Sequence, residues 1–323
     1  MYGWLNRQFR RGYERLLRRE IGEGPTHVAI IQDGNRRYAR KQGEDAPEGH
    51  REGADTAEQV LNWCEELGID ELTLYAFSTE NFERPPEERE PLFDIIEAKL
   101  YELADSDRVH TNEVSIRAIG EIERLPERVQ DAIAYAEAET ADYNSFRLNV
   151  ALAYGGRNEL LRAAREVATA VDNGDLDADD VDPEAIENRL YRQPVRDVDL
   201  IIRTGGDERT SNFLPWHANG NEAAVYFCAP YWPEFSKIDF LRGIRTYEAR
   251  EESWQESKID RAVALAGAVG SLELKEASEL VSRLRGKLPQ AGRRAVAEEL
   301  ETATPADDDS ESPGADATLD LAD

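Results

Sequence analysis

The chain has little lysine, almost no cysteine and no long hydrophobic run. Only six of its 39 basic residues are lysine, whereas 67 residues are acidic and the net charge is −28. This charge excludes a diffuse surface for nucleic acid, because a polyanion would be repelled. An acid-rich, lysine-poor surface is expected of a halophilic protein dissolved in concentrated salt, where repulsion is screened. The alternative is an ordinary acidic cytosolic protein.

The scarcity of cysteine excludes a metal site built from a cysteine cluster. Cys64 and Cys228 both lie inside apolar stretches, which predicts two buried thiols rather than a disulfide. The sequence shows no signal peptide and no apolar stretch long enough to span a bilayer. We therefore expect the body of the protein to be cytoplasmic.

Three segments differ in composition. Residues 1–24 carry six arginines against three glutamates, with apolar residues at helical spacing, and predict a basic amphipathic helix. Such a helix suits peripheral contact with an anionic membrane, but it suits packing on the domain or on a partner subunit equally well. Residues 25–290 are predicted to form the main domain. Residues 291–323, acidic towards their end, are predicted to be a disordered tail.

Within the main domain, apolar strands alternate with helical patterns. Strands are predicted at 27–31, 71–77, 114–119, 147–153, 198–202 and 223–228. Helices are predicted at 51–67, 87–104, 126–140, 157–173, 183–191, 236–251 and 255–286. This alternation predicts a single α/β domain with a central, mostly parallel six-stranded sheet flanked by helices. Ligands of such sheets bind at the carboxyl ends of the strands.

The first predicted strand runs into Asp33-Gly34-Asn35-Arg36-Arg37. Glycine permits close approach of the backbone, and the amide groups at a helix start bind phosphate oxygens. Arg37 adds a forked cation, and Asp33 adds a carboxylate for Mg²⁺, which shares its oxygen ligands with phosphates. The triplet Asp33-Gly34-Asn35 alone would indicate a turn. With the strand before it and the arginines after it, it predicts a diphosphate site.

The second predicted strand is followed by a polar segment, Ser78 to Arg84, ahead of Pro85 and Pro86. The prolines favour the start of the next helix, so the segment is predicted to form a loop above the sheet. It contains Ser, Glu, Asn, an aromatic residue and Arg, a set of side chains that suits a substrate-binding or catalytic site. The alternative is that these residues cap a helix.

The fifth predicted strand ends in two arginines, Arg203 and Arg209, with two glycines between them and Ser211 beyond. Forked cations, a hydroxyl and glycine amides predict a second anion-binding site. His50 is predicted to precede the helix at 51–67, and a lone histidine of this kind is structural unless it faces the same sheet edge.

These motifs resemble those of the cis-prenyltransferase family, most closely its archaeal undecaprenyl diphosphate synthases. The likeness runs from about His27 to Arg250 through five motifs in the family's order: His27 to Arg37, Leu74 to Phe82, Asn149 to Arg157, Arg203 to Trp216 and Tyr231 to Phe235. It implies repeated condensation of isopentenyl diphosphate onto an allylic diphosphate, with cis geometry. It also implies an α/β homodimer whose helices and sheet enclose a hydrophobic tunnel.

The resemblance assigns roles to the two anion-binding segments. Asp33 would hold Mg²⁺ on the allylic diphosphate and assist its departure, with His50 nearby. The allylic diphosphate would be bound by Gly34, Asn35, Arg36 and Arg37. The diphosphate of isopentenyl diphosphate would be bound by Arg203, Arg209, Thr210 and Ser211.

It also assigns roles to the segment after the second strand. Ser78, Thr79, Glu80 and Asn81 would position the acceptor and remove its proton. Asn81 matches the proposed proton acceptor, but an amide is a poor base, so it would orient a relay ending on diphosphate or on His50. The aromatic residues beside the prenyl chain would be Tyr38 and Phe82, with the arginine Arg84 nearby.

Three positions depart from the family pattern. Ala46 stands where an arginine commonly contacts the allylic phosphate, and Arg36 or Arg51 would have to supply that contact. Gln32 replaces the usual methionine before Asp33. The segment that follows Trp216 is two residues longer than usual, so the second metal carboxylate falls on Glu222 when counted from Trp216 and on Ala224 when counted back from Tyr226. Glu222 is favoured because it is the only carboxylate within reach.

Two other functions fit parts of the pattern: a shorter-chain cis-prenyl diphosphate synthase, and a noncatalytic partner subunit of another synthase. The retained aspartate and arginines disfavour the second. If the origin is a halophilic archaeon, we expect geranylgeranyl diphosphate as the primer and a dolichol-type glycosyl carrier as the fate of the product. The residues themselves fix neither the primer nor the chain length.

Overall fold

The computed structural model describes residues 2–191, 195–220 and 223–268, and it divides into two units, residues 1–250 and 251–323. The first unit contains one six-stranded sheet in which every neighbouring pair is parallel, in the order β3-β4-β2-β1-β5-β6. The strands are β1 His27–Ile31, β2 Glu71–Tyr75, β3 Val114–Ile119, β4 Phe146–Ala151, β5 Leu200–Arg203 and β6 Ala224–Phe227. All six predicted strands are confirmed, each within two residues at either end.

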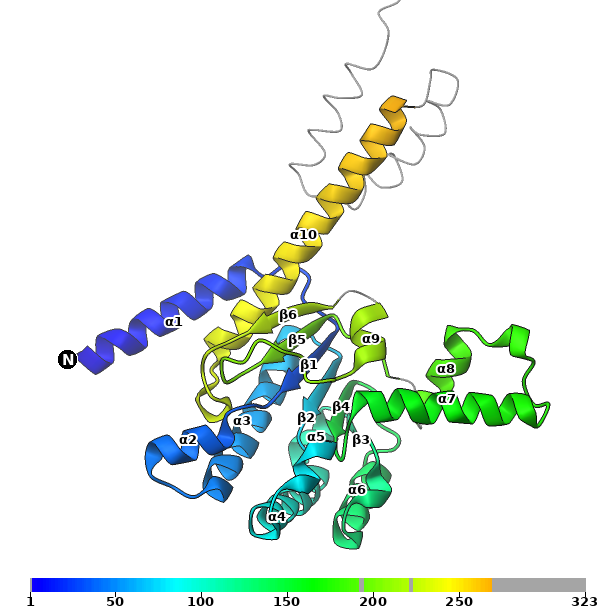
Figure 1. Ribbon diagram of the computed structural model, residues 1–323. Coiled ribbons are helices and arrows are strands. Elements are labelled where there is room, and N and C mark those ends of the chain that lie inside the picture. Colours follow the sequence, from blue (N-terminus) through cyan, green and yellow to red (C-terminus); the bar gives the residue numbers. More distant parts are fainter. Residues whose placement is uncertain (1, 192–194, 221–222, 269–323) are drawn as a thin grey trace, which may run out of the picture. The chain divides into compact units, whose positions relative to one another are not determined.

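Helices connect the strands (Figure 1). They are α1 Tyr2–Glu20, α2 Asn35–Gln42, α3 Ala46–Leu67, α4 Pro86–Ala104, α5 Asp107–Thr111, α6 Glu127–Glu139, α7 Gly156–Asp172, α8 Pro183–Leu190, α9 Pro215–Gly220 and α10 Lys237–Ala268. The predicted helices are present, except that 236–251 and 255–286 form one helix as far as Ala268; residues 269–286 lie outside the described part. The sequence patterns missed the short helices α2, α5 and α9.

The helix α3 begins earlier than predicted, and this changes the place of His50. A proline stabilises the first turn, because Pro47 has no N–H group to leave unpaired there. The helix therefore starts at Ala46 rather than near residue 51. The prediction that His50 precedes the helix was wrong: the residue lies inside its second turn.

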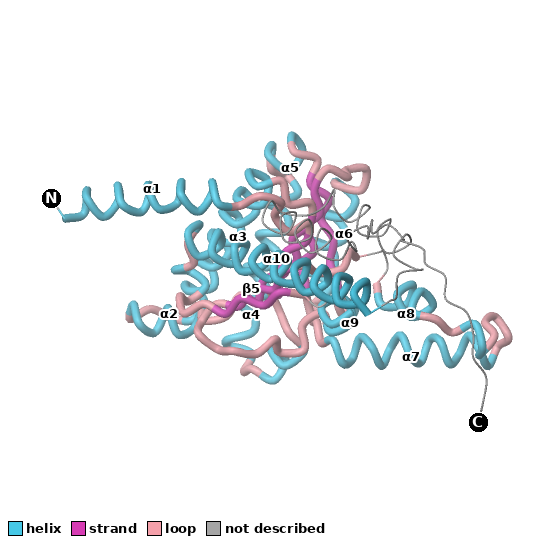
Figure 2. Tube along the Cα trace, turned by 90° about the horizontal axis from the view of Figure 1, so that it is seen from above, coloured by secondary structure: helices cyan, strands magenta, loops and turns pink. Residues whose placement is uncertain are grey.

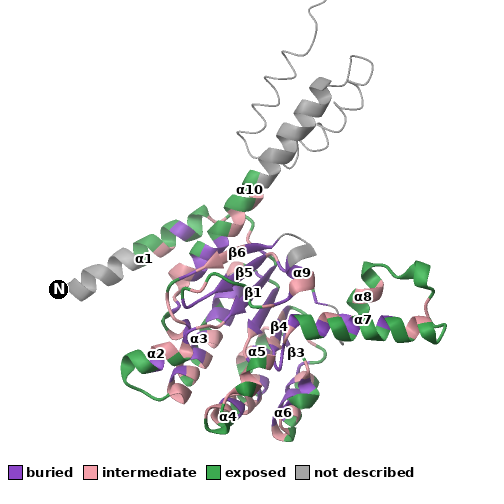
Figure 3. Ribbon diagram, in the orientation of Figure 1, coloured by how far each residue is buried: buried purple, intermediate pink, exposed green. Residues whose placement is uncertain are grey.

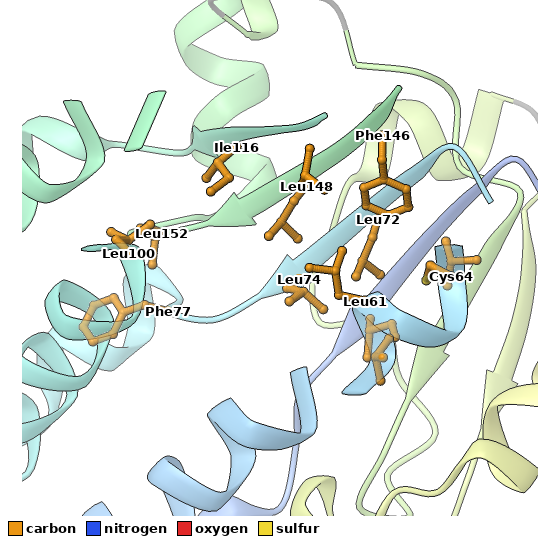
Figure 4. Close-up of a cluster of buried hydrophobic side chains, with 14 of the residues drawn as sticks. Leu61, Cys64, Leu72, Leu74, Phe77, Leu100, Ile116, Phe146, Leu148 and Leu152 are labelled. Atoms are coloured by element: carbon orange, nitrogen blue, oxygen red, sulfur yellow. The ribbon is translucent and has the colours of Figure 1, made fainter. Parts of the chain in front are cut away.

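Alternate residues of the strands face opposite sides of the sheet. In Figure 2 the strands lie between helices, and in Figure 3 most strand residues are buried, whereas three of the four residues of β6 are of intermediate exposure. One face carries an apolar layer against α3, α4 and α6, and Figure 4 shows part of it, with Leu61 of α3 near Leu72 and Leu74 of β2 and Leu148 of β4. A second, smaller apolar cluster on the other face includes Tyr154, Phe213 and Leu214.

The described end of α1 packs on the domain. Leu17 is 1% exposed, Arg18 pairs with Glu66 of α3, and Lys237 of α10 pairs with Glu14. This confirms the packing interpretation for residues 11–20, while several arginines there, such as Arg11 and Arg15, point to solvent. Among the described helices, none is long and apolar enough to cross a membrane. The predicted acidic tail, 291–323, lies outside the described residues.

Candidate active site

The two anion-binding segments meet because β1 and β5 are neighbours in the sheet, with Ile31 beside Arg203. The backbone of Asp33 is fixed by Thr204, whose hydroxyl accepts from the Asp33 N–H (3.0 Å) and donates to the Asp33 carbonyl (2.7 Å). The Trp232 N–H donates to the same carbonyl at 3.0 Å. These three bonds hold the Asp33 carboxylate at the carboxyl edge of the sheet.

Asp33 lies between two arginines, one from each segment. Arg203 donates from Nη2 to Oδ2 at 2.6 Å, and Arg37 donates from Nη2 to Oδ1 at 3.0 Å. Partial burial raises the pKa of Asp33, but the hydrogen bonds and charge of Arg203 and Arg37 outweigh it and the pKa is lowered. The carboxylate is therefore ionised at neutral pH.

Arg203 also organises the second anion-binding segment. Its Nη1 donates to the Arg209 carbonyl at 2.6 Å and to the Ser211 hydroxyl at 2.5 Å. Asp207, which sequence reasoning missed, accepts from Arg203 (3.4 Å) and Arg209 (3.2 Å). The Arg203 side chain is 4% exposed, whereas Arg209, Thr210 and Ser211 lie at the surface, so the segment presents polar groups outward from a buried anchor.

Two glycines are required by the close packing of this edge. Gly34 has φ of 106°, and a Cβ there would come within 2.7 Å of the Tyr231 ring. Gly205 has φ of 87°, and a Cβ there would lie 2.6 Å from Arg37 Nη2 and 3.1 Å from the Asp33 carbonyl. Both positions therefore hold the main chain close enough for the two segments to share Asp33.

A cavity opens over Asp33. Its lining residues are Gln32, Asp33, Gly34, Asn35, Arg36, Arg37, Arg40, His50 and Arg84. Among these described residues there are four arginines and one carboxylate, in a chain whose net charge is −28. This local reversal of sign favours an anion. Every allylic-site residue expected from the resemblance lies in the lining, and Arg84 does too.

Arg40 is the lining residue that sequence reasoning did not identify. It follows Arg36 by four residues and Arg37 by three, so all three lie on one side of α2. This spacing was the signal available in the sequence. Arg36 also contacts Glu88 of α4 at 3.3 Å, whereas Arg51 pairs with Glu48 at 2.6 Å and lines a different, outer groove. Arg36 and Arg40, not Arg51, are therefore placed to supply the contact absent at Ala46.

We predict that Arg40→Met raises KM for the allylic diphosphate about tenfold, because it removes one charge-assisted hydrogen bond to phosphate. KM for isopentenyl diphosphate should stay unchanged. Steady-state kinetics with each substrate varied in turn would measure this. Arg51→Met is the matched control and should behave as wild type; a larger effect at Arg51 than at Arg40 would reverse the assignment.

His50 lines the cavity from α3, so it faces the same edge as Asp33. Burial, and then the charges of Arg84 and Arg36, lower its pKa to about 4. The imidazole is therefore neutral at physiological pH and offers a hydrogen-bond acceptor rather than a cation.

The segment after β2 is a helical turn rather than the predicted loop. Residues Thr79–Glu83 form the 3-10 helix η1, capped by Ser78, whose side chain accepts from the Asn81 N–H while the Ser78 N–H donates to Asn81 Oδ1 at 3.1 Å. The alternative interpretation, helix capping, is the one the structure confirms. Phe82 packs against Phe77 with ring centroids 5.1 Å apart. Tyr38 lies outside the cavity lining, and hydrogen bonding to Glu52 of α3 raises the pKa of its hydroxyl.

A hydrophobic cavity adjoins the charged one. Its apolar lining comes from helices α3 and α4 and from the face of the sheet that they cover: Ala54, Ala57, Leu61, Leu74, Ala76, Leu92, Ile95, Ile96, Leu100, Leu103, Leu148 and Val150. Gln32, Asn35 and His50 line both cavities. The predicted hydrophobic tunnel therefore corresponds to a cavity between α3, α4 and the sheet, with the arginine-rich cavity at its polar end.

Behind the second anion-binding segment lies a buried carboxylate that sequence reasoning missed. Glu159 of α7 accepts from the hydroxyls of Tyr154 (2.6 Å) and Tyr191 (3.0 Å). Tyr154 in turn packs edge-on against Phe213, at 5.9 Å, just beyond Ser211. Burial raises the pKa of Glu159 to about 7 despite these hydrogen bonds.

The raised pKa predicts a pH dependence of stability. Because the folded state holds the Glu159 proton more tightly than the unfolded state does, the free energy of unfolding should fall as pH rises from 4.5 to about 7. The loss is at most about 3 kcal/mol. Glu159→Gln should abolish this part of the slope in urea unfolding, and the surface variant Glu166→Gln should retain it. An unchanged slope in Glu159→Gln would contradict the assignment.

The site has the donors that a magnesium ion shared with a diphosphate requires. Mg²⁺ binds through one or two carboxylates and completes its shell with water and phosphate oxygens. Asp33 supplies an ionised carboxylate at the cavity wall, so the residues fit. The described residues contain no group of three or more metal-binding side chains. Glu222, the predicted second carboxylate, lies outside the described residues.

A parallel sheet with an arginine-rich cavity that adjoins an apolar one suits a ligand with an anionic head and a hydrocarbon tail. The family model for undecaprenyl diphosphate synthases matches residues 31–255. A tritrans,polycis-undecaprenyl-diphosphate synthase (geranylgeranyl-diphosphate specific) from Halobacterium salinarum is 66% identical over 277 residues, covering 86% of this chain and 91% of the relative. A protein of the same name from Haloarcula marismortui is 62% identical over 291 residues, covering 90% and 96%.

The fold is shared with a solved relative. Lavandulyl diphosphate synthase from Lavandula x intermedia, in complex with dimethylallyl diphosphate, superposes with a TM-score of 0.64 at 35% identity, covering 69% of this chain and 95% of that one. The chain belongs to the undecaprenyl diphosphate synthase family, and it is a cis-prenyltransferase. Its similarity to proteins of halophilic archaea agrees with its acid-rich, lysine-poor composition.

Proposed function

We propose that this enzyme extends geranylgeranyl diphosphate with successive isopentenyl units to a long-chain, undecaprenyl-like diphosphate. One observation carries the proposal: the arginine-rich cavity and the hydrophobic cavity share Gln32, Asn35 and His50. A molecule with a diphosphate head and a hydrocarbon tail fits across that junction. The names of the relatives support the choice of primer and product.

In this proposal Asp33 holds Mg²⁺ against the allylic diphosphate, and the ion supplies charge that stabilises the departing diphosphate. Arg36, Arg37 and Arg40 bind the diphosphate oxygens, and the N–H groups at the start of α2 point the same way. Glu222 remains the second metal carboxylate proposed from the sequence. The hydrocarbon lies between α3 and α4, against the apolar lining of that cavity.

Isopentenyl diphosphate is proposed to bind at Arg209, Thr210 and Ser211, with buried Arg203 holding that segment in place. A carbon–carbon bond then forms as the allylic diphosphate leaves, and the acceptor loses a proton. Asn81 is bonded to Ser78, so its contribution is to shape η1 and orient the acceptor. The departing diphosphate, or His50 beside it, receives the proton.

Mass analysis of the products would test this proposal. The full chain, with Mg²⁺ and isopentenyl diphosphate at high salt, should use geranylgeranyl diphosphate in preference to farnesyl diphosphate and give one main long-chain product. Preference for the shorter primer, or arrest after one condensation, would contradict it. A long polyprenyl diphosphate of this kind suits a dolichol-type glycosyl carrier.

Two associations belong to the same proposal. The homodimer follows from the resemblance, and Leu161 on α7, 54% exposed, offers an apolar contact for it; light scattering should give twice the monomer mass.

Peripheral contact with an anionic membrane would use the exposed arginines of α1, such as Arg11 and Arg15. The double variant Arg11→Ser/Arg15→Ser should then sediment less with anionic vesicles, while its sedimentation with neutral vesicles should stay unchanged.

A further inference from the structure

The hydrophobic cavity has an ion pair in its wall. Among its described lining residues, Glu58 of α3 and Lys99 of α4 are both charged, and Lys99 Nζ donates to Glu58 Oε1 at 2.7 Å. Lys99 also lies 2.8 Å from Glu102 and 3.5 Å from Asp55. One ammonium group therefore joins α3 to α4 through carboxylates on both helices.

The pair stands where the cavity meets the outside. Lys99 and Ile95 line the hydrophobic cavity and also an outer groove between α3 and α4. The Lys99 side chain is 25% exposed and that of Glu58 36%, so water reaches the pair from the outer side. Glu58 follows His50 by eight residues, which places it about 12 Å further along α3 from the polar end.

An ion pair in this position opposes the advance of a hydrocarbon. Burial lowers the pKa of Lys99, but the hydrogen bonds that it donates to Glu102 and Glu58 outweigh burial and the pKa is raised, so the group stays charged. Each added isoprene unit gains free energy by lying against apolar wall. A unit that covers the pair strips its remaining water, and that desolvation offsets the gain.

We propose that the Glu58–Lys99 ion pair limits the chain length of the product, by making further entry of the growing hydrocarbon unfavourable at the seam between α3 and α4. The inference rests on the proposed function, since it needs an enzyme that elongates repeatedly. It adds a determinant of product length distinct from the groups that bind diphosphate.

The test is the apolar double variant Glu58→Met/Lys99→Met in the full chain. With geranylgeranyl diphosphate and excess isopentenyl diphosphate, its main product should be longer than that of wild type by at least one isoprene unit. The rate of the first condensation should stay within about twofold, because the diphosphate sites are untouched. An unchanged or shorter main product would overturn the inference.

Arg128→Met is a matched control. Arg128 of α6 contacts three carboxylates of α4, Glu97 (2.5 Å), Asp94 (2.8 Å) and Glu90 (3.3 Å), without lining the hydrophobic cavity. Arg128→Met should make the wild-type product. Lys99→Arg should do the same, because arginine preserves the ion pair with Glu58. Longer products from Arg128→Met would show that loosening α4 suffices, and would overturn the inference.

Two further results keep the test decisive. If the double variant does not fold, the polar but uncharged variant Glu58→Gln/Lys99→Gln should shift the product in the same direction, and an unchanged product from this variant would overturn the inference. If wild type itself makes no elongated product from geranylgeranyl diphosphate, the proposed function fails. If instead wild type elongates the primer and the variants make a product of the same length, only the role of the Glu58–Lys99 pair is refuted.

Discussion

Asp33→Asn should abolish prenyl transfer while leaving the fold intact. Asn keeps the shape of the side chain but loses the charge that would hold Mg²⁺ beside the allylic diphosphate, and Asp33 is the one carboxylate among the described residues lining that cavity. We expect kcat to fall on the order of 10³-fold, as when a preorganised electrostatic contact to a transition state is lost. Single-turnover assays across a magnesium titration would measure the loss.

The fold should survive because Arg203 keeps other partners. Its guanidinium still bonds Asp207, the Arg209 carbonyl and the Ser211 hydroxyl, and the Thr204 bonds involve only the Asp33 backbone. Thermal unfolding should therefore shift by a few degrees at most. Asp70→Asn, which removes an exposed partner of Arg196 beyond the other end of the strands, is the control and should keep full activity. Near-normal turnover in Asp33→Asn would refute the metal assignment.

The strands, and the location of the two anion-binding segments at one edge of the sheet, were predictable from sequence because each rests on a local pattern. Continuous apolar runs mark strands buried on both faces, and the carboxyl ends of parallel strands lie at one edge. Asp33 and Arg203 therefore had to lie on the same edge. Their direct contact depends on β1 and β5 being neighbours, which the order of strands along the chain does not state.

The remaining features depend on contacts that hydrophobic periodicity does not encode. α2 has few apolar residues, so the pattern gave no helix and the shared face of Arg36 and Arg40 was missed. The sequence of the segment after β2 was compatible with either a loop or a helix cap. Only the reciprocal hydrogen bonds between Ser78 and Asn81 decide between the two. The buried Glu159 needed tyrosines from two separate segments to become recognisable.

Arg203→Lys should damage both binding and stability, although it preserves the charge. The planar guanidinium bonds Asp33 and Asp207 through Nη2, and the Arg209 carbonyl and Ser211 hydroxyl through Nη1. A lysine ammonium is a compact point charge and cannot reach both sides at once. Loss of two charge-assisted hydrogen bonds, each worth about 1.5–3 kcal/mol, predicts a fall in kcat/KM for isopentenyl diphosphate on the order of 10²–10⁴-fold.

The same change should lower the free energy of unfolding by about 2 kcal/mol, because a side chain that is only 4% exposed loses hydrogen bonds that join β5 to β1 and to the second anion-binding segment. Arg209→Lys separates the two effects. Arg209 is 69% exposed, so its replacement should raise KM for isopentenyl diphosphate without changing the unfolding midpoint. If Arg203→Lys raised KM but left stability at the wild-type value, Arg203 would act only as a substrate ligand. Its role as the buried anchor shared by the two diphosphate sites would then be wrong.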